Sequence, residues 1–199
     1  MENWTKENLI TFEREIERMW TEGRIKSPVH FSGGNEEQLI KIFKKIKPTD
    51  YVFSTHRSHY HYLLKGGDPT ELVSKILNGE SICINEPKIK FYSSGIVCGT
   101  PAIAVGVALA LKRKKSKNRV WCFLGDGALD EGHFYEAYRY AQSMNLPIMF
   151  IIEHNNRSVE ASVEQRWGSN KIKTNKHLNV YYYNPTYPHV GNGKWVKFT

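Results

Sequence analysis

An apolar run, a helical segment and a second apolar run follow one another in the second half of the chain. Residues 120–124 read Val-Trp-Cys-Phe-Leu, and residues 147–152 read Pro-Ile-Met-Phe-Ile-Ile. Residues 133–144, between them, have helical character. Continuous apolar strands separated by a helix are typical of a parallel sheet that is buried on both faces. The sequence therefore predicts an α/β fold, a parallel sheet with helices on both faces.

Further helices are expected before this unit. Apolar residues recur at helical spacing over residues 5–21 and 36–45, and Gly23 and Pro48 follow these two patterns as stop signals. Residues 69–77 form another helical pattern, preceded by an aspartate that can cap it and opened by a proline at its first position. A short strand is expected just after the second helix, at the sequence Tyr-Val-Phe.

Small and apolar residues follow Thr100 and Pro101. The segment 102–111 contains Gly106 and four alanines. A helix of such residues can approach another backbone closely, so we expect it to be buried near the centre of the fold.

The chain is predicted to be a single domain. It has 199 residues, 40% of them apolar, which is enough for one substantial core. We divide it into an N-terminal helical extension (1–50), a core that carries the motifs (51–167) and a C-terminal extension (168–199). Its apolar runs are far shorter than the roughly 18 residues of a membrane span. Charged residues follow Met1, so a cytoplasmic protein is expected.

The net charge of +8 comes in large part from one basic run at residues 112–119. This run separates a predicted helix from a predicted strand, where a solvated turn is expected, so nucleic-acid binding is not favoured. Cys83, Cys98 and Cys122 form no CxxC pair and have apolar neighbours. This pattern predicts buried free thiols.

Polar residues follow both strands of the predicted β-α-β unit. Residues 125–127 read Gly-Asp-Gly, and residues 154–156 read His-Asn-Asn. In a right-handed unit both turns emerge at the carboxyl edge of the sheet, where open α/β folds bind ligands. The carboxylate of Asp126, an asparagine amide oxygen and a backbone carbonyl suit Mg²⁺, which shares its ligands with phosphates. The glycines let backbone amides approach a phosphate closely.

These segments resemble a known family. Residues 125–128 (Gly-Asp-Gly-Ala) through Asn155 and Asn156 are similar to the thiamine diphosphate motif, and their surroundings are similar to the alpha subunit of the first component of 2-oxo acid dehydrogenases. Residues 56–59 (His-Arg-Ser-His) resemble the family's Tyr-Arg-x-His segment, and residues 95–97 (Gly-Ile-Val) resemble its Gly-Ile-Val loop. The resemblance extends from Tyr51 to Trp167 and implies the thiamine diphosphate-binding fold.

The resemblance implies thiamine diphosphate and Mg²⁺ as cofactors. Asp126 is implied as a magnesium ligand, with Asn155 and the main-chain carbonyl of Arg157 as the other protein ligands. Asn156 is the alternative to Asn155. We favour Asn155 because an alignment without gaps from Gly125 onward matches it with the second asparagine of the family.

Other residues are implied to hold the diphosphate. Gly125 belongs to the turn, and Gly127 and Ala128 offer backbone contacts. Arg57 is expected to pair with a diphosphate oxygen, because the planar fork of a guanidinium matches phosphate. His56 replaces the tyrosine of the family and can still hydrogen-bond a phosphate.

The resemblance also assigns residues near the reacting end of the cofactor. His59 matches a family histidine that faces this end, so a catalytic role is implied for it. Gly95, Ile96 and Val97 are implied to lie beside the aminopyrimidine and to contact it through backbone groups. A plain glycine turn before a buried helix is the alternative for this loop.

A second chain is expected to complete the active site. Thiamine chemistry needs a carboxylate that hydrogen-bonds the aminopyrimidine, so that it can remove the thiazolium proton. Families of this kind supply this glutamate from a pyrimidine-binding domain, for which residues 157–199 are too few. The expected partner is a beta-type subunit that carries this domain and the catalytic glutamate, in an α₂β₂ heterotetramer acting on a small-molecule substrate.

The favoured function is that of the alpha-type subunit of a two-subunit enzyme. The enzyme would cleave a 2-oxo acid or ketose and transfer the acyl or aldehyde unit, with dehydrogenase-like decarboxylation favoured. A split transketolase-like or carboligating enzyme is the alternative, because the alpha subunits of the dehydrogenases are longer. A noncatalytic regulatory or nucleic-acid-binding subunit is the alternative of another class. Retention of Asp126, Asn155 and Arg57 argues against it, because buried polar groups without a ligand are costly.

Overall fold

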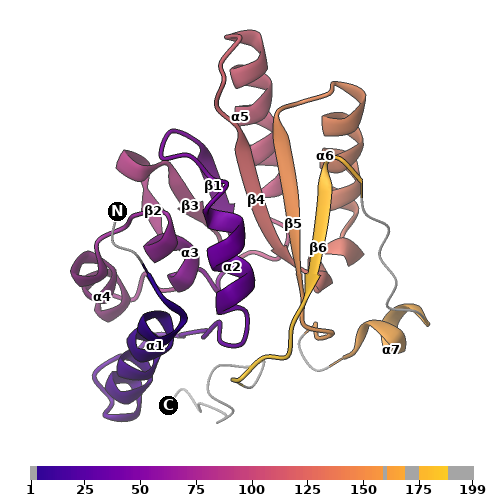
Figure 1. Cartoon of the computed structure of the whole chain (residues 1–199). Helices are drawn as coiled ribbons and strands as arrows, with labels where there is room; N and C mark the ends of the chain where they lie inside the picture. The colour runs from indigo at the N-terminus through magenta and orange to yellow at the C-terminus, as the bar shows by residue number, and fades with distance from the viewer. Residues whose placement is uncertain (1–3, 159–160, 169–174, 188–199) are drawn as a thin grey trace.

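A six-stranded sheet with the strand order β2-β3-β1-β4-β5-β6 forms the centre of the molecule (Figure 1). The computed structural model describes residues 4–158, 161–168 and 175–187. Neighbouring strands run parallel, except that the edge strand β2 is antiparallel to β3. The predicted α/β fold is confirmed. The strands are β1 (Tyr51–Ser54), β2 (Asn85–Glu86), β3 (Phe91–Ser93), β4 (Val120–Gly125), β5 (Ile148–His154) and β6 (Leu178–Tyr182).

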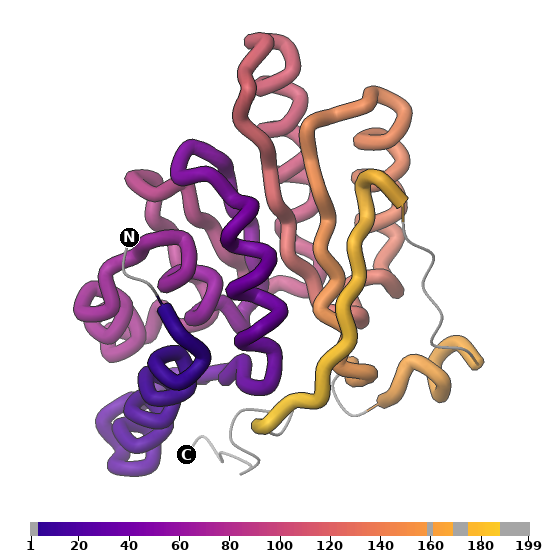
Figure 2. Tube along the Cα trace, viewed as in Figure 1, coloured from indigo at the N-terminus to yellow at the C-terminus, as the bar shows by residue number. Residues whose placement is uncertain are grey.

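Helices cover both faces of this sheet. Figure 1 shows α5 and α6 behind the sheet and α2 in front of it, and Figure 2 follows the chain from β4 through α6 into β5, the predicted β-α-β unit. The α-helices are α1 (Lys6–Thr21), α2 (Glu36–Phe43), α3 (His59–Leu64), α4 (Pro69–Leu77), α5 (Pro101–Arg113), α6 (Gly132–Ser143) and α7 (Val163–Trp167), and the 3-10 helices are η1 (Pro87–Ile89) and η2 (Asp126–Asp130).

Side chains of the central strands alternate between two hydrophobic clusters. Trp121 and Phe123 of β4 point into the cluster that α1 to α4 cover. Cys122 and Leu124 point to the opposite face, where α5 and α6 pack. Successive residues of a strand face opposite sides, so a strand covered on both faces must be apolar throughout. This is why the sequence of β4 is a continuous apolar run.

The two terminal segments belong to the same structure. Leu9 of α1 and Leu39 of α2 are fully buried in the first cluster. Strand β6 pairs in parallel with β5, from Phe150 opposite Leu178 to His154 opposite Tyr182. The segments that we predicted as N-terminal and C-terminal extensions therefore contribute a helical layer and a sheet strand.

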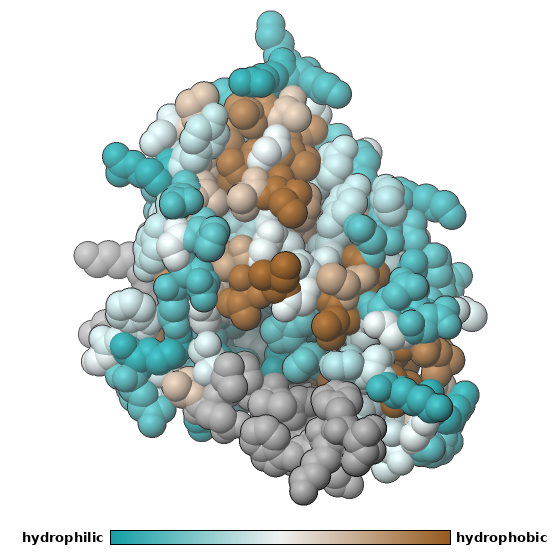
Figure 3. All heavy atoms as spheres, turned by 180° about the vertical axis from the view of Figure 1, so that it is seen from behind, coloured by the Kyte–Doolittle hydropathy of each residue, from teal (hydrophilic) through white to brown (hydrophobic). Residues whose placement is uncertain are grey.

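The prediction that α5 is a buried central helix is wrong for this chain taken alone. Its inner side packs on the sheet through residues such as Ala104 and Ala108, which are fully buried. Its outer side is exposed, and Ile103 there has an exposed fraction of 60%. Figure 3 shows apolar surface on this side of the molecule. Gly106, on this outer side, has open space where a side chain would be, so none of the described residues packs against this position.

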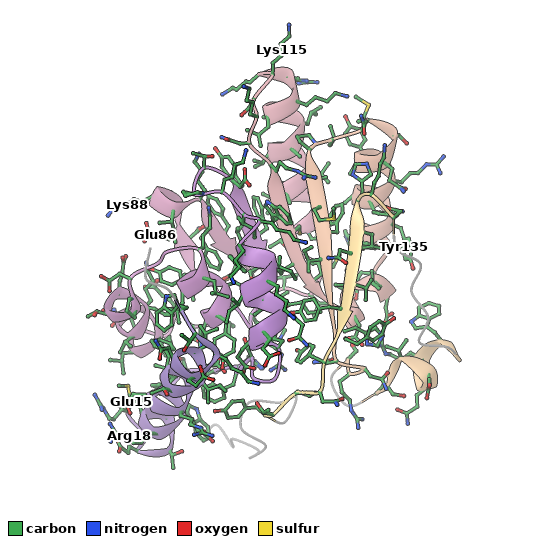
Figure 4. All side chains as sticks on the ribbon, in the orientation of Figure 1. Glu15, Arg18, Glu86, Lys88, Lys115 and Tyr135 are labelled. Carbon is green, nitrogen blue, oxygen red and sulfur yellow. The ribbon has the colours of Figure 1, made fainter. Side chains whose placement is uncertain are left out.

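The basic run forms an exposed turn, as predicted. Helix α5 ends within it, and Lys115 projects from the far end of α5 in Figure 4. Cys98 and Cys122 are buried free thiols, but Cys83 is exposed, which corrects the prediction for that residue. None of the helices in the described ranges combines the length and the apolar character that crossing a bilayer requires.

Candidate functional site

A cavity of about 360 Å³ lies at the carboxyl ends of β1, β4 and β5. Its volume is in the range of small-molecule binding sites. It also lies where open parallel sheets bind ligands, because the loops after neighbouring strands meet at one edge. The cavity wall brings together eleven predicted site residues: His56, Arg57, Gly95, Ile96, Val97, Gly125, Asp126, Gly127, Ala128, Asn155 and Arg157.

Asp126 is the central polar residue of this wall. It begins η2 directly after β4 and is only 2% exposed. Neither of its carboxylate oxygens has a hydrogen-bond donor among the described residues. Burial raises the pKa of Asp126; His154 is the first group that opposes this shift, and the positive charge of Arg166 also opposes it. A buried carboxylate without donors is costly, so the arrangement calls for a cation.

The two asparagines after β5 point to different surroundings. Asn155 lines the cavity, and its Oδ1 accepts the Arg157 backbone N–H at 3.0 Å. Asn156 has a positive φ of 59°, and its Oδ1 accepts the Val163 N–H at 3.0 Å. Asn156 is therefore committed to the start of α7, whereas Asn155 stays at the cavity.

Gly127 lies where a larger residue does not fit. A Cβ atom at this position would lie 2.5 Å from Ser158 Oγ and 2.9 Å from its Cβ. Gly125 has open space around the same position. The motif therefore needs its second glycine for the close approach of the loop after β5, and its first glycine leaves the cavity open.

Arg57 and two histidines form the wall beside β1. The Arg57 guanidinium donates to the Phe31 carbonyl through Nη1 at 2.8 Å, and burial lowers the pKa of Arg57. His56 lies edge-on to His30, with ring centroids 4.6 Å apart. Burial, and secondly the charge of Arg57, lowers the pKa of His30 to about 4. His30 is therefore neutral at neutral pH, and Arg57 provides the positive charge of this wall.

The Gly95-Ile96-Val97 loop forms the open side of the cavity. Ile96 has an exposed fraction of 75% and Val97 one of 56%. At Gly95 a larger residue would be crowded, because its Cβ would lie 3.1 Å from the Ile82 side chain. Two exposed apolar side chains at the entrance of a cavity are typical of a surface that another molecule covers.

His59 does not lie in the cavity wall, which corrects the prediction that it faces the cofactor. It is the first residue of α3 and is fully buried. Its Nε2 lies 3.0 Å from Ser81 Oγ, and its Nδ1 lies 3.4 Å from Glu13 Oε1. The helix that begins here turns the ring into the core, so a direct catalytic contact has no geometric support.

Glu153, which the sequence analysis missed, lies in the cavity wall at the end of β5. Its Oε1 accepts Asn35 Nδ2 at 3.2 Å, lies 3.2 Å from His61 Nε2, and also accepts the Tyr181 hydroxyl. His61 Nδ1 in turn lies 2.7 Å from Ser54 Oγ. The Glu153 carboxylate is thus held by three groups, from the loop before α2, from α3 and from β6, which fixes the wall of the cavity.

Three further residues near Asp126 were also missed. Ser158 and Tyr183 line the cavity, and burial followed by the Glu153 charge raises the pKa of Tyr183, which keeps the phenol protonated. His154 Nδ1 lies 3.9 Å from Asp126 Oδ2. Glu153 and His154 adjoin the predicted asparagines in sequence, whereas Tyr183 reaches the site only because β6 pairs beside β5.

Residues 5–177 match the dehydrogenase E1 component family. The chain belongs to this family. It is 32% identical, over 154 residues, to the alpha subunit of acetoin:2,6-dichlorophenolindophenol oxidoreductase from Bacillus subtilis. The aligned region covers 72% of this chain and 46% of the relative. It is 31% identical, over 165 residues, to the pyruvate dehydrogenase E1 component subunit alpha of Rickettsia prowazekii. This aligned region covers 78% of this chain and 51% of the relative.

The comparisons therefore confirm the family that the sequence motifs indicated. Membership implies dependence on thiamine diphosphate. The chain spans about half the length of the curated relatives that it matches.

Proposed function

We propose that this chain supplies the diphosphate- and Mg²⁺-binding half of the active site in an alpha-type subunit of a thiamine diphosphate-dependent 2-oxo acid dehydrogenase. The observation that carries the proposal is the buried Asp126 carboxylate, which lies in the cavity wall without a hydrogen-bond donor among the described residues. Arg166 Nη2 lies 3.7 Å from Oδ2, beyond hydrogen-bond distance, so both oxygens remain available to a metal ion.

The residues present fit a magnesium ion. Asp126, Asn155 and the carbonyl of Arg157 offer oxygen ligands, which Mg²⁺ prefers, and diphosphate oxygens and water would supply the rest. Each asparagine oxygen accepts one backbone N–H, and Asn155 is favoured over Asn156 because Asn155 is the one that lines the cavity. The described residues contain no cluster of three or more His, Cys, Asp or Glu side chains that could hold a metal.

The diphosphate would lie between the cavity wall beside β1, which carries Arg57, and the turn after β4 at residues 125–128. Arg57 provides the positive charge there, and the backbone amides of Gly127 and Ala128 lie at the start of η2. Gly125 leaves open space, and His56 is a further hydrogen-bonding group at the cavity wall. This arrangement combines a charge with oriented amides, which is how proteins bind phosphates.

The open side of the cavity supports a second subunit. We propose that a beta-type subunit covers Ile96 and Val97, contributes the pyrimidine-binding domain with its glutamate, and assembles with this chain as an α₂β₂ heterotetramer. The exposed outer side of α5, with Ile103, provides further apolar surface for it. Burying such surface would stabilise the assembly and exclude water from the cofactor.

When bound, thiamine diphosphate supplies a nucleophilic carbon that attacks a carbonyl and stabilises the resulting carbanion. We propose a 2-oxo acid as substrate and transfer of the acyl unit after decarboxylation. The names of the relatives, a pyruvate dehydrogenase component and an acetoin oxidoreductase, favour this chemistry over the transketolase-like alternative. The role of this chain is to fix the metal and diphosphate so that the reactive end reaches the interface.

Calorimetric titration of thiamine diphosphate with Mg²⁺ tests the proposal. We expect tight binding to a mixture of this chain with its beta-type subunit, weak or absent binding to the chain alone, and loss of binding in the mixture with Asp126→Asn. Wild-type affinity of the Asp126→Asn mixture would remove Asp126 from the site. Absence of binding in the wild-type mixture would contradict the proposed function.

A further inference from the structure

The guanidinium of Arg166, in α7, lies between two acidic residues of η2, Asp126 and Asp130. Its Nη2 lies 3.7 Å from Asp126 Oδ2, and its Nη1 forms an ion pair with Asp130 Oδ2. Its side chain is only 17% exposed, so the guanidinium is largely withdrawn from water. Arg166 approaches Asp126 from the side of α7 and lies outside the cavity wall described above. The carboxylate proposed to bind the metal ion therefore already faces a cation of this chain.

His154 also lies near Asp126, but its nearest atom makes a different hydrogen bond. Its Nδ1, the atom nearest to Asp126, accepts the backbone N–H of Asn156 at 3.1 Å. Because Nδ1 accepts this hydrogen bond, it has no N–H to donate to Asp126. Within the described part of the chain, Arg166 is then the permanent positive charge within ion-pair distance of Asp126.

Helix α7 is attached to the metal-binding loops at both of its ends. Its first N–H, that of Val163, donates to Asn156 Oδ1 at 3.0 Å. Its last residue, Trp167, donates through Nε1 to Asp130 Oδ1 at 2.5 Å. Asp130 thus holds both Arg166 and Trp167, and the Asp126 contact of Arg166 is additional to this anchor.

A divalent cation at Asp126 would bring a second positive charge to one buried carboxylate. Charges attract and repel more strongly in a partly desolvated site than in water, so the two cations would compete for Asp126. Arg166 can release Asp126 at low cost because its ion pair with Asp130 remains. The position of Arg166 therefore allows two arrangements, one in which its charge faces Asp126 and one that leaves Asp126 to a metal.

We propose that Arg166 is the internal counter-ion of Asp126, which sets the affinity of the cation site and couples its occupation to α7. The inference rests on the proposed function, because it needs a divalent cation at Asp126. Filling the site would displace the guanidinium toward Asp130, and α7 would lose its contact with Asp126 while it keeps its two anchors. Removing the guanidinium would strengthen cation binding, because the metal would no longer compete with it.

Electron paramagnetic resonance of Mn²⁺ in the presence of inorganic pyrophosphate measures this affinity on the full chain mixed with its beta-type subunit, the state in which the proposed function expects binding. We expect Arg166→Gln to bind Mn²⁺ about fivefold or more tightly than the wild type, which is the lower range of coupling between two ligands. Arg166→Lys keeps the charge and should stay within about twofold of the wild type. Arg139→Gln, at an exposed position of α6, is the matched arginine control and should leave the affinity unchanged.

Hydrogen–deuterium exchange provides a second readout that does not depend on enzyme activity. In the wild type, Mg²⁺ with pyrophosphate should change exchange in residues 163–167, because the Asp126 contact is lost, whereas in Arg166→Gln, which lacks this contact, the metal should leave exchange there unchanged. Equal or weaker Mn²⁺ binding by Arg166→Gln, with native circular dichroism, would overturn the inference while the proposed function stands. Absence of binding by the wild type and by Arg166→Gln would overturn both.

Discussion

Gly127 and Gly125 flank the same aspartate but have different steric surroundings. A Cβ at Gly127 would meet Ser158 Oγ at 2.5 Å, whereas a Cβ at Gly125 would meet nothing within 4 Å. We expect Gly127→Ala to lower the free energy of unfolding by about 1 to 3 kcal/mol, the usual cost of overpacking. Gly125→Ala should cost clearly less. Thermal denaturation of the metal-free chain compares the two variants.

The double variant Gly127→Ala with Ser158→Gly identifies the cause. Removing the Ser158 side chain removes the two closest atoms, so the double variant should recover most of the stability that Gly127→Ala loses. Equal destabilisation by Gly125→Ala and Gly127→Ala would show that the contact with Ser158 does not limit this position.

His30 gives the cavity a pH-dependent contribution to stability. Burial and the charge of Arg57 lower its pKa from 6.5 to about 4, so the unfolded chain binds the proton more readily than the folded chain. Its contribution is therefore present above about pH 6.5 and is lost as the pH falls toward 4. The ring is only partly buried, so we expect a loss of about 1 to 2 kcal/mol rather than the full shift.

Replacing His30 with glutamine should flatten the dependence of melting temperature on pH between about 4 and 6.5. The exposed His133 of α6 is the matched control, and His133→Gln should leave this slope unchanged. An unaltered slope in His30→Gln would mean that His30 titrates alike in the folded and unfolded chain.

The sequence predicted the cavity residues better than it predicted the direction of single side chains. Asp126 and Asn155 were assigned correctly to one edge because strand order and right-handed crossover fix where their backbones lie. His59 was placed wrongly because its direction depends on α3, whose first residue turns into the core. Tyr183 was missed because its approach depends on the pairing of β5 with β6.

Helix α5 shows why an element can be predicted correctly and its surroundings wrongly. Its small and apolar residues form a helix as expected, but only one side meets this chain. Composition alone does not distinguish burial inside one chain from burial between two chains. The wrong prediction is thus informative, because an exposed apolar side of a helix is typical of a surface that another molecule covers.

Two substitutions in adjacent residues of α5 separate folding from assembly. Ile103 is 60% exposed, so Ile103→Glu should change the free energy of unfolding by about 0.5 kcal/mol or less. Ala104 is fully buried, so Ala104→Glu should destabilise the chain by about 3 kcal/mol or more, because an unpaired charge would enter the core.

We expect Ile103→Glu to weaken association with the beta-type subunit, which size-exclusion chromatography of the mixture measures. Ala102→Ser, at an exposed position of the same helix, is a small polar change and should have little effect. Unchanged association of the Ile103→Glu chain would exclude this side of α5 from the interface.

At the scale of the whole molecule, the carboxylates of the cavity are already committed. Asp126 and Glu153 are the aspartate and glutamate residues of its described wall. Asp126 is proposed to bind the metal, and Glu153 is held by His61, Asn35 and Tyr181. Neither carboxylate of the described wall is left to hydrogen-bond the aminopyrimidine, and the proposed beta-type subunit would supply the group that removes the proton.

We therefore expect this chain alone to leave the thiazolium C2 proton of thiamine diphosphate unactivated, even with saturating Mg²⁺. Proton NMR of C2–H exchange in deuterated buffer should give the rate of the free cofactor for the chain alone and a rate at least about 100-fold higher with the beta-type subunit. Asp126→Asn mixed with that subunit should return the rate to that of free cofactor, because it removes the metal ligand but not the partner's glutamate. Fast exchange with the chain alone would show that one of its own groups, with Glu153 the first to test by Glu153→Gln, activates the cofactor without a second subunit.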